Sequence, residues 1–298
     1  MVNTVNIQTV KKVNPRAEAM KKAWYKFSRN PLSVLGLVVV VGVIFVAVFA
    51  TVLAPHPEDA GLSIHMTETF QAPGLAHLAG TDEYGRDVFS RILIGLRYSL
   101  AIGLLVLAIS VPFGVLMGLL AGYYKGRLIE AIIMRFTELF MSIPPLILAM
   151  VICTMFSSKY IFAAIGIAVA WWPWYTRITY NLVTSLSNEL YIVYTQLSGV
   201  KMMKIIIQEM LPNIMSPILT KMSLDMGSII ITASSMSFVG LGVQPPTPSL
   251  GEMISSGIKY LPNIWWLTIM PALMVVLVVL GFNLLGDGLS DVLSVEEK

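Results

Sequence analysis

One long uncharged run constrains the fold of this chain more than any other feature. From Leu32 to Ala54 the sequence contains no Asp, Glu, Lys or Arg. At 1.5 Å per residue, a helix over this run is long enough to cross the ~30 Å of hydrocarbon in a bilayer. The run is too long for the apolar core of a signal peptide, and no small-residue cleavage pattern follows it. It therefore predicts a membrane-spanning helix.

The composition agrees with a membrane protein and excludes an ordinary soluble domain. The 298 residues are 56% hydrophobic and 12% charged, whereas soluble domains are about 25% charged. Further apolar runs lie near residues 98–124, 132–157, 161–181, 214–240 and 264–286. We therefore expect an all-α membrane protein with six transmembrane helices. The single cysteine, Cys153, lies inside one of these runs, which leaves no disulfide framework and no cysteine-based metal site.

Basic residues are concentrated in residues 1–31, before the first span. This segment has one acid, Glu18, and its basic residues are Lys11, Lys12, Arg16, Lys21, Lys22, Lys26 and Arg29. Basic flanks of a span are retained in the cytoplasm, so we expect the N-terminus to lie inside. Met20, Trp24 and Phe27 recur at helical spacing, which is typical of a helix at the membrane interface. A nucleic-acid-binding arm is the alternative, and the adjoining span argues against it.

Six spans from an inside N-terminus place the C-terminus inside as well. The spans occupy 32–293, and 294–298 form a cytoplasmic tail. On this topology 55–97 is an extracytoplasmic loop and 182–213 is the longest cytoplasmic loop. Arg86, Arg91 and Arg97 in the first of these loops run against the topology, but the N-terminal cluster outweighs them.

Prolines are expected to interrupt two of the spans. Proline lacks a backbone N–H and clashes with the preceding helical turn. Pro144 and Pro145 lie inside the third span, and Pro112 lies with Gly114 inside the second. Broken spans are tolerated where the freed backbone groups face protein or water. These positions predict a packed bundle that lines a cavity.

The 182–213 loop has the pattern of a helix–turn–helix. Residues 189–198 and 201–211 both have helical character, and Gly199 between them suits the positive φ at which helices end. Pro212 is expected to end the second helix before the fifth span. One face of that helix should carry Met203, Ile206, Ile207, Met210 and Leu211, and another should carry Lys201, Lys204 and Gln208. The residues alone fit either a helix resting on lipid or a docking element for a cytoplasmic partner.

Two pairs of charged residues fall within predicted spans. Lys221 and Asp225 are four residues apart in the fifth span, and Arg135 and Glu138 are three apart in the third. Such residues are costly in lipid and usually face the bundle interior or a wet cavity. Each pair is either a structural ion pair or part of a solute pathway, where Asp225 would meet a cationic group.

Other polar and aromatic clusters admit a structural and a functional interpretation. The three histidines, His56, His65 and His77, lie in the 55–97 loop near Glu58 and Asp59, but their irregular spacing argues against a metal site. Arg86 and Asp87 are expected to fix the fold of this loop, with contact to a docked protein as the alternative. Aromatic residues end the fourth span, at Trp171, Trp172, Trp174 and Tyr175. They are expected either to anchor the helix at the cytoplasmic interface or to form a gate.

Reactive motifs are missing from the sequence. It contains no G-x(4)-G-K-[ST] phosphate loop, so ATP binding is expected in another polypeptide. No Ser/His/Asp or Cys/His set falls in one compartment, which argues against an enzyme.

Several segments together resemble one family of transporters. Gly199 followed by Leu211-Pro212 is similar to the second half of the "EAA" loop of ABC importer permeases, with Met210 replacing the usual isoleucine. The Glu-Ala-Ala positions are occupied by Val193, Tyr194 and Thr195. The segments that resemble the C-type permeases of peptide/nickel importers are "AWYKFSRNPLSVLGL" (23–37), "HLAGTDEYGRDVFSRILIGLRYSL" (77–100), "MSFVGLGVQPPTPSLGEMI" (236–254) and "FNLLGDGLSDVL" (282–293).

This resemblance implies a type I ABC importer permease fold in a prokaryotic inner membrane. It implies a heterodimer with a B-type permease, two cytoplasmic ATPases that bind ATP and Mg²⁺, and an extracytoplasmic solute-binding protein. Peptides are the leading substrate class, and nickel or a metal–chelator complex is the alternative within the family. The rival from another class is a stand-alone secondary transporter that relays protons through Asp225 and Glu138.

The resemblance also assigns residue roles. The coupling helices of the family lie in a groove of the ATPase, and the corresponding residues here are Val193, Tyr194, Thr195, Gln196, Leu197, Ser198, Gly199, Val200, Met203 and Pro212. The pathway residues are expected to be Asp225, Glu138 and Arg135. No cofactor, metal or nucleic acid is expected on this chain, and membrane lipid surrounds it.

Overall fold

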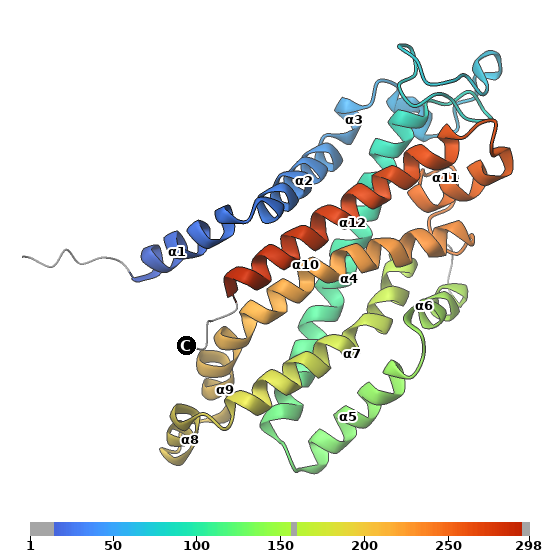
Figure 1. Ribbon diagram of the computed structural model, residues 1–298. Coiled ribbons are helices and arrows are strands. Elements are labelled where there is room, and N and C mark those ends of the chain that lie inside the picture. The colour runs from blue at the N-terminus through green and yellow to red at the C-terminus, as the bar shows by residue number, and fades with distance from the viewer. Residues whose placement is uncertain (1–14, 156–159, 294–298) are drawn as a thin grey trace, which may run out of the picture.

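A computed structural model of the protein describes residues 15–155 and 160–293, and it consists of helices and connecting loops. No β-strand is present in these ranges, where the only extended pairing is an isolated bridge between Thr81 and Asp87. The long helices lie side by side, with α8 and α9 at one end of the bundle and the loop after α3, together with α11, at the other (Figure 1). The predicted all-α fold is confirmed.

The helices follow the apolar runs of the sequence, and most are longer than those runs. Their bounds are α1 Pro15–Arg29, α2 Pro31–Val48, α3 Ala50–Leu53, α4 Val88–Tyr123, α5 Leu128–Met141, α6 Pro145–Thr154, α7 Tyr160–Leu186, α8 Leu190–Leu197, α9 Met202–Ile205, α10 Leu211–Phe238, α11 Leu250–Gly257 and α12 Trp266–Leu293. Single 3₁₀ turns lie at Pro57–Ala60, Met66–Glu68 and Ile258–Tyr260, and a π-helical turn lies at Ile206–Met210.

Four of the described helices are long and apolar enough to cross a membrane. They are α2, α4, α12 and a continuous helix, Met202–Phe238, that includes α10. A fifth span results if α5 and α6, which are bent by 87° at their junction, are counted as one. The expected count of six is therefore not confirmed. The remaining candidate, α7, has 27 residues, but Trp, Pro, Tyr and Arg in its middle lower its mean hydropathy.

The two predicted proline interruptions have different outcomes. Pro144 and Pro145 lie at the sharp bend between α5 and α6, as expected. Pro112 lies inside α4, an unbroken helix of 36 residues, so the predicted break at this proline is wrong. Neighbouring helices make such a proline tolerable in a membrane bundle.

Glycines bring α4 into direct contact with α7. Gly114, Gly118 and Gly122 are spaced by four residues and are all buried. A Cβ atom on Gly118 would lie 2.5 Å from Cβ of Thr179, and one on Gly122 would lie 2.7 Å from Cγ1 of Val183. Small residues at this spacing let helix backbones approach closely, which is how helices associate in lipid.

The N-terminal helix α1 packs on α12 through one aromatic residue. Phe27 is buried, and its ring lies 2.9 Å from the position of a Cβ on Gly288. Trp24 is 59% exposed, so the two aromatic residues do not share one buried face. Asn30 then begins α2, because its side-chain oxygen accepts a hydrogen bond from the Leu32 amide at 3.1 Å. Lys11 and Lys12 lie outside the described residues.

The α4–α7 contact predicts a large effect from one methyl group. We expect Gly118→Ala to lower the unfolding temperature of the purified protein, because overpacking costs about 1–3 kcal/mol. Gly42→Ala is the matched control, since a Cβ there meets nothing within 4 Å in the same kind of helix. Alanine at this control position should maintain or raise stability. Equal melting curves for the two variants, measured in one detergent, would contradict the packing account.

Candidate functional site

The segment between α7 and α10 forms a compact helical hairpin at one end of the bundle (Figure 1). Its first helix, α8, ends at Gly199, which has φ +74°. The Gly199 amide donates to Gln196 O at 3.0 Å and the Val200 amide to Thr195 O at 3.4 Å. These two bonds form a Schellman motif, which requires the left-handed conformation that glycine adopts without strain. The predicted positive φ of Gly199 at the end of a helix is confirmed.

The second arm of the hairpin does not end at Pro212, contrary to expectation. It runs as α9, a π-helical turn and α10 without interruption, so that Met202–Phe238 is one helix of 37 residues. Pro212 lies in the first turn of α10, directly after the π turn. The different hydrogen-bond spacing of a π turn accommodates the missing proline N–H. The arm is therefore a direct extension of a membrane-spanning helix.

The apolar residues of this arm do not share one face, which corrects the prediction from helical periodicity. Ile206 and Met210 are buried, whereas Met203 and Ile207 are 65% and 53% exposed. Met203 and Ile207 are four residues apart, as are Ile206 and Met210, so the exposed pair and the buried pair form two adjacent strips along the arm. One apolar side anchors the arm, and the other faces outward.

Specific contacts fix the hairpin to the bundle. The Tyr124 hydroxyl at the end of α4 donates to Sδ of Met202 at 3.0 Å. The Asn213 side-chain amide donates to the Tyr191 hydroxyl at 3.3 Å, which links α10 to α8. Partial burial, together with the charges of Glu189 and Glu209, raises the pKa of Tyr191 above its usual value.

An exposed apolar surface remains at the end of the hairpin. We call it the apolar tip, and it consists of Leu190, Tyr194, Leu197, Met203 and Ile207. Leu197 is the most exposed of these, at 78%. Exposed apolar patches of this kind mark contact with a protein or a membrane.

The predicted coupling residues divide into an exposed set and a set that is half-buried or supports α8. Tyr194, Gln196, Leu197 and Met203 are exposed, whereas Val193 and Val200 are half-buried. The hydroxyls of Thr195 and Ser198 donate to backbone carbonyls of α8, at 2.7 and 2.8 Å, so they support the helix. Leu190, which is 70% exposed, was not among the predicted coupling residues, because its position before the resemblance motif gave no signal.

The charged pair in α10 lies in the bundle interior. Nζ of Lys221 is 3.0 Å from Oδ1 of Asp225, and Asp225 is only 9% exposed. Nζ of Lys221 also lies 5.6 Å from the ring centroid of Tyr175. Within the described residues, Oδ2 of Asp225 and the Tyr175 hydroxyl are both buried without a hydrogen bond of acceptable geometry. The interior position of Asp225 agrees with the expectation, and Tyr175 joins it as a neighbour that the sequence did not reveal.

The other predicted pair lies on the surface of this chain. Nη1 of Arg135 is 3.3 Å from Oε2 of Glu138, and the Arg135 side chain is 84% exposed. Arg177 of α7 approaches the same carboxylate at 3.7 Å. Glu138 therefore contacts Arg135 of its own helix, α5, and Arg177 of α7. Nothing in the sequence links Arg177 to Glu138.

The aromatic cluster of α7 does not lie at a helix end. Trp171 and Tyr175 are buried, and α7 continues to Leu186. Trp172 packs edge-on against Phe113 of α4 and Phe140 of α5, with ring centroids 5.2 and 5.4 Å away. Trp171 and Tyr175 belong to the bundle core, whereas Trp174 is 41% exposed, so the cluster is only partly buried.

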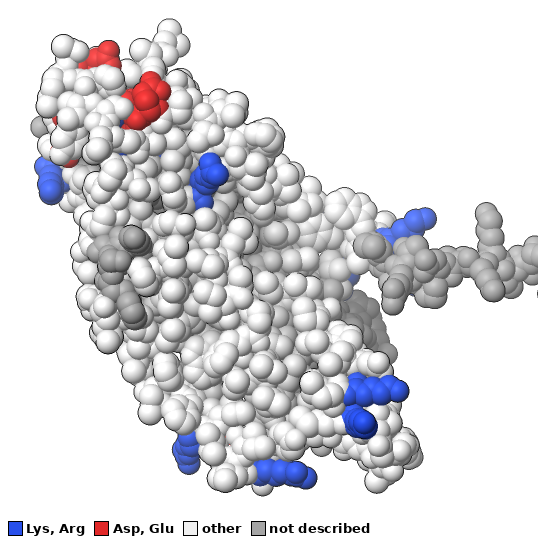
Figure 2. Space-filling model, turned by 180° about the vertical axis from the view of Figure 1, so that it is seen from behind, with Lys and Arg blue, Asp and Glu red and all other residues white. Residues whose placement is uncertain are grey.

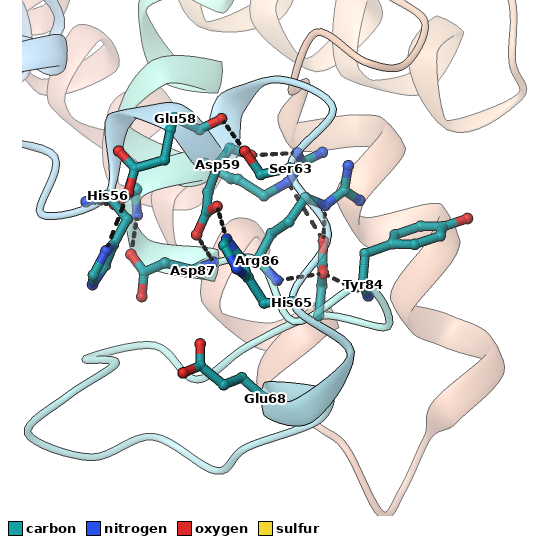
Figure 3. Close-up of polar contacts among 12 residues, drawn as sticks. His56, Glu58, Asp59, Ser63, His65, Glu68, Tyr84, Arg86 and Asp87 are labelled. Carbon is teal, nitrogen blue, oxygen red and sulfur yellow. Dashed lines mark hydrogen bonds and ion pairs between the residues drawn. The ribbon is translucent and has the colours of Figure 1, made fainter.

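Each histidine of the segment between α3 and α4 pairs with a different carboxylate, and Figure 3 shows His56 beside Glu58 and His65 beside Asp59. His65 lies 3.0 Å from Asp59, and His77 lies 3.0 Å from Asp87. His56 lies 3.6 Å from Glu58. Among the described residues, no three His, Cys, Asp or Glu side chains converge as metal ligands. The imidazoles stabilise the loop through separate contacts.

Asp87 and Arg86 both fix the loop, although not by pairing with each other. Asp87 caps α4 by accepting from the Ser90 amide at 2.8 Å, while its other oxygen contacts His77. Nε of Arg86 donates to Asp82 at 2.7 Å. The buried Arg91 donates to the Asp59 carbonyl at 2.9 Å. The expected structural role of Arg86 and Asp87 fits these contacts.

A polar cavity of about 300 Å³ lies beside this loop, against α11. Its lining includes Arg86, Arg91 and Glu252. Burial raises the pKa of the Glu252 carboxyl, and the two arginines oppose this shift in part. The cavity places these charged groups at the end of the bundle opposite the hairpin.

The capping network predicts a selective loss of stability. We expect Asp87→Ala to destabilise the protein by about 1–3 kcal/mol, because it removes a helix cap and a buried partner of His77. Glu58→Ala is the matched control, since its side chain is 59% exposed and its histidine contact is 3.6 Å long. Thermal unfolding and protease cleavage within 55–87 report the effect. Equal resistance of both variants would show that Asp87 does not hold the loop.

Comparisons with known proteins extend over nearly the whole chain. Residues 114–294 match the family described as "Binding-protein-dependent transport system inner membrane component". Residues 19–73 match "N-terminal TM domain of oligopeptide transport permease C".

Curated relatives align along most of their length. The dipeptide transport system permease protein DppC of Alkalihalophilus pseudofirmus is 34% identical over 286 residues, covering 96% of this chain and 91% of the relative. The di/tripeptide transport system permease protein DppC of Pseudomonas aeruginosa is 36% identical over 282 residues, covering 94% and 93%.

A solved structure shares the fold. An inward-facing form of the MetNI methionine ABC transporter aligns with a TM-score of 0.53 at 19% identity, covering 67% of this chain and 94% of that one. The long family match and the high coverage of the relatives agree with the membrane helices described above. The chain thus belongs to the inner membrane components of binding-protein-dependent transport systems, as a C-type permease subunit of an ABC importer.

Proposed function

We propose that this chain forms half of the translocation pathway for dipeptides and other short peptides. The observation that carries the proposal is that the curated relatives described are permeases for short peptides. Those from Alkalihalophilus pseudofirmus and Haemophilus influenzae are dipeptide permeases, and the one from Pseudomonas aeruginosa is a di/tripeptide permease. A probable D,D-dipeptide permease of Escherichia coli is 34% identical. The shared chemistry of these substrates is a short peptide with free termini.

The proposed assembly contains this chain, a B-type permease, two cytoplasmic ATPases and an extracytoplasmic solute-binding protein. ATP and Mg²⁺ bind to the ATPases, since this sequence has no phosphate-binding loop. The hairpin end faces the cytoplasm in this proposal, together with both termini. Figure 2 supports this orientation, because most visible Lys and Arg side chains lie toward the hairpin end and the visible Asp and Glu side chains lie toward the other.

The hairpin between α7 and α10 is proposed as the element that couples ATP hydrolysis to transport. Its apolar tip is the docking surface for an ATPase, since five large apolar side chains are exposed there. The arm below the tip continues into a membrane-spanning helix of 37 residues. A push on the tip therefore moves a helix of the pathway as a rigid element. Asp225, Glu138 and Arg135 are proposed as pathway residues, with Asp225 facing a cationic group of the peptide.

Uptake by the reconstituted transporter tests the substrate class and the energy source. We expect ATP-dependent uptake of a labelled dipeptide into proteoliposomes that contain both permeases and both ATPases, with the binding protein added. Excess unlabelled dipeptide should compete, whereas nickel ions should not. Uptake driven by an ion gradient, in vesicles that hold this chain alone, would overturn the proposal in favour of a secondary transporter.

The turn at Gly199 provides a test of coupling. A Cβ at this position meets nothing within 4 Å, so a substitution there strains the backbone without a clash. We expect Gly199→Val to reduce transport and peptide-stimulated ATPase activity about tenfold, because a left-handed residue with a side chain costs about 1–2 kcal/mol and displaces the tip. Gly199→Asn should retain most activity, since asparagine tolerates this conformation.

Gly126 supplies the matched control for this test. It has φ +79° in the turn between α4 and α5, and a Cβ there also meets nothing within 4 Å. Gly126→Val thus introduces the same strain away from the apolar tip. If both valine variants lose transport equally, at equal amounts of assembled protein, the effect is general strain and the coupling role of the hairpin is refuted.

A further inference from the structure

An elongated apolar groove runs between α2, α4, α10 and α12. Its volume is about 720 Å³, and its lining residues include Ile44, Ala47, Leu100, Leu104, Met222 and Phe282. The short helix α3 follows α2 and packs on α4, where Ala50 lies with Leu93 and Ile94. The walls of the groove come from α2, α4, α10 and α12.

Arg97 is the only charged residue that lines the groove. Its side chain is exposed, and it forms no ion pair with any residue in the part of the chain that the structure describes. An unpaired cation within a membrane helix is costly unless it reaches a polar partner. The groove therefore combines a long apolar wall with one cation whose partner must come from elsewhere.

The depth of Arg97 agrees with the level of lipid phosphates. α4 has 36 residues, which gives a length of about 54 Å at 1.5 Å per residue. This length exceeds the hydrocarbon thickness of about 30 Å by about 24 Å, or about 12 Å at each end of a centred helix. Arg97 lies nine residues after Val88, about 14 Å from that end of α4. It is thus placed at the boundary between hydrocarbon and head groups.

We infer that this groove binds one anionic phospholipid, with its phosphate on Arg97 and an acyl chain along the groove. A guanidinium binds phosphate through charge-assisted hydrogen bonds. The α4 wall of the groove extends from Arg97 to Leu107, which is ten residues or about 15 Å. An acyl chain lies along this wall and contacts its apolar side chains. A peptide with two charged termini fits this groove poorly. The groove offers Arg97 to the peptide carboxylate but no acidic side chain to the peptide ammonium group. The lipid fills the groove beside α2 and α4, while α2 itself is held by its contact with α12.

Lipid retention by the assembled transporter tests this inference. The complex is reconstituted in nanodiscs with equal amounts of phosphatidylglycerol and phosphatidylcholine, extracted in detergent and examined by native mass spectrometry. We expect the wild type to retain phosphatidylglycerol in preference to phosphatidylcholine. Arg97→Gln should lower this retention about fivefold, since a basic residue near the surface contributes about 1 kcal/mol to binding an anionic lipid. Arg97→Lys should retain most of it, because the charge remains.

Two further variants separate the groove from surface charge in general. Ala101→Trp fills the groove while leaving Arg97 in place, and it should also remove the retained lipid. Arg127→Gln removes an exposed arginine outside the groove and should leave retention unchanged. Equal retention of the two lipids, wild-type retention by Arg97→Gln, or a helix of the partner permease seated in the groove of the assembled complex would each overturn the inference. None of these readouts depends on peptide transport.

Discussion

Close contact between helix backbones is the interaction on which this structure depends. Inside a bilayer, burial of apolar side chains does not drive helices together, because lipid tails are equally apolar. The glycines of α4 allow α7 to approach within contact distance of its backbone, and Gly36 and Gly281 do the same between α2 and α12. These contacts leave little room for independent movement of the helices that they join, so the bundle moves in large pieces.

α4 connects the two ends of the molecule within this framework. Its first turn is capped by Asp87, which also holds His77 of the preceding loop. Its other end contacts the hairpin through Tyr124 and Met202. One helix thus joins a loop stiffened by ion pairs to the element that carries the apolar tip. This arrangement suits a permease, in which events on the two sides of a membrane must be linked.

The sequence predicts those features that depend on local chemistry. Apolar runs gave the helices, and the preference of glycine for positive φ gave the turn at Gly199. The bend at Pro144 and Pro145 followed from the missing N–H groups. Asp225 was expected in the interior, because an unpaired carboxylate in lipid is costly.

Features that depend on neighbouring helices could not be predicted. Pro112 and Pro212 have the same local chemistry as Pro144, yet packing and a π turn keep their helices continuous. Met203 and Ile207 are exposed while Ile206 and Met210 are buried, because only one side of the arm packs against the bundle. Arg177 reaches Glu138 only because α5 and α7 lie side by side. The burial of Trp171 and Tyr175 likewise depends on the helices that pack against α7.

In the proposed coupling, the hairpin and α10 move as one rigid element. Spin labels at Tyr194→Cys in α8 and Ile231→Cys in α10, in a Cys153→Ala background, measure this directly by pulsed electron resonance in the assembled transporter. Both label sites are exposed, at 65% and 48%. The account predicts one distance distribution within the subunit, unchanged between nucleotide-free and ATP-bound states. A distribution that shifts or broadens on ATP binding would show that the hairpin bends relative to α10, and would contradict the account.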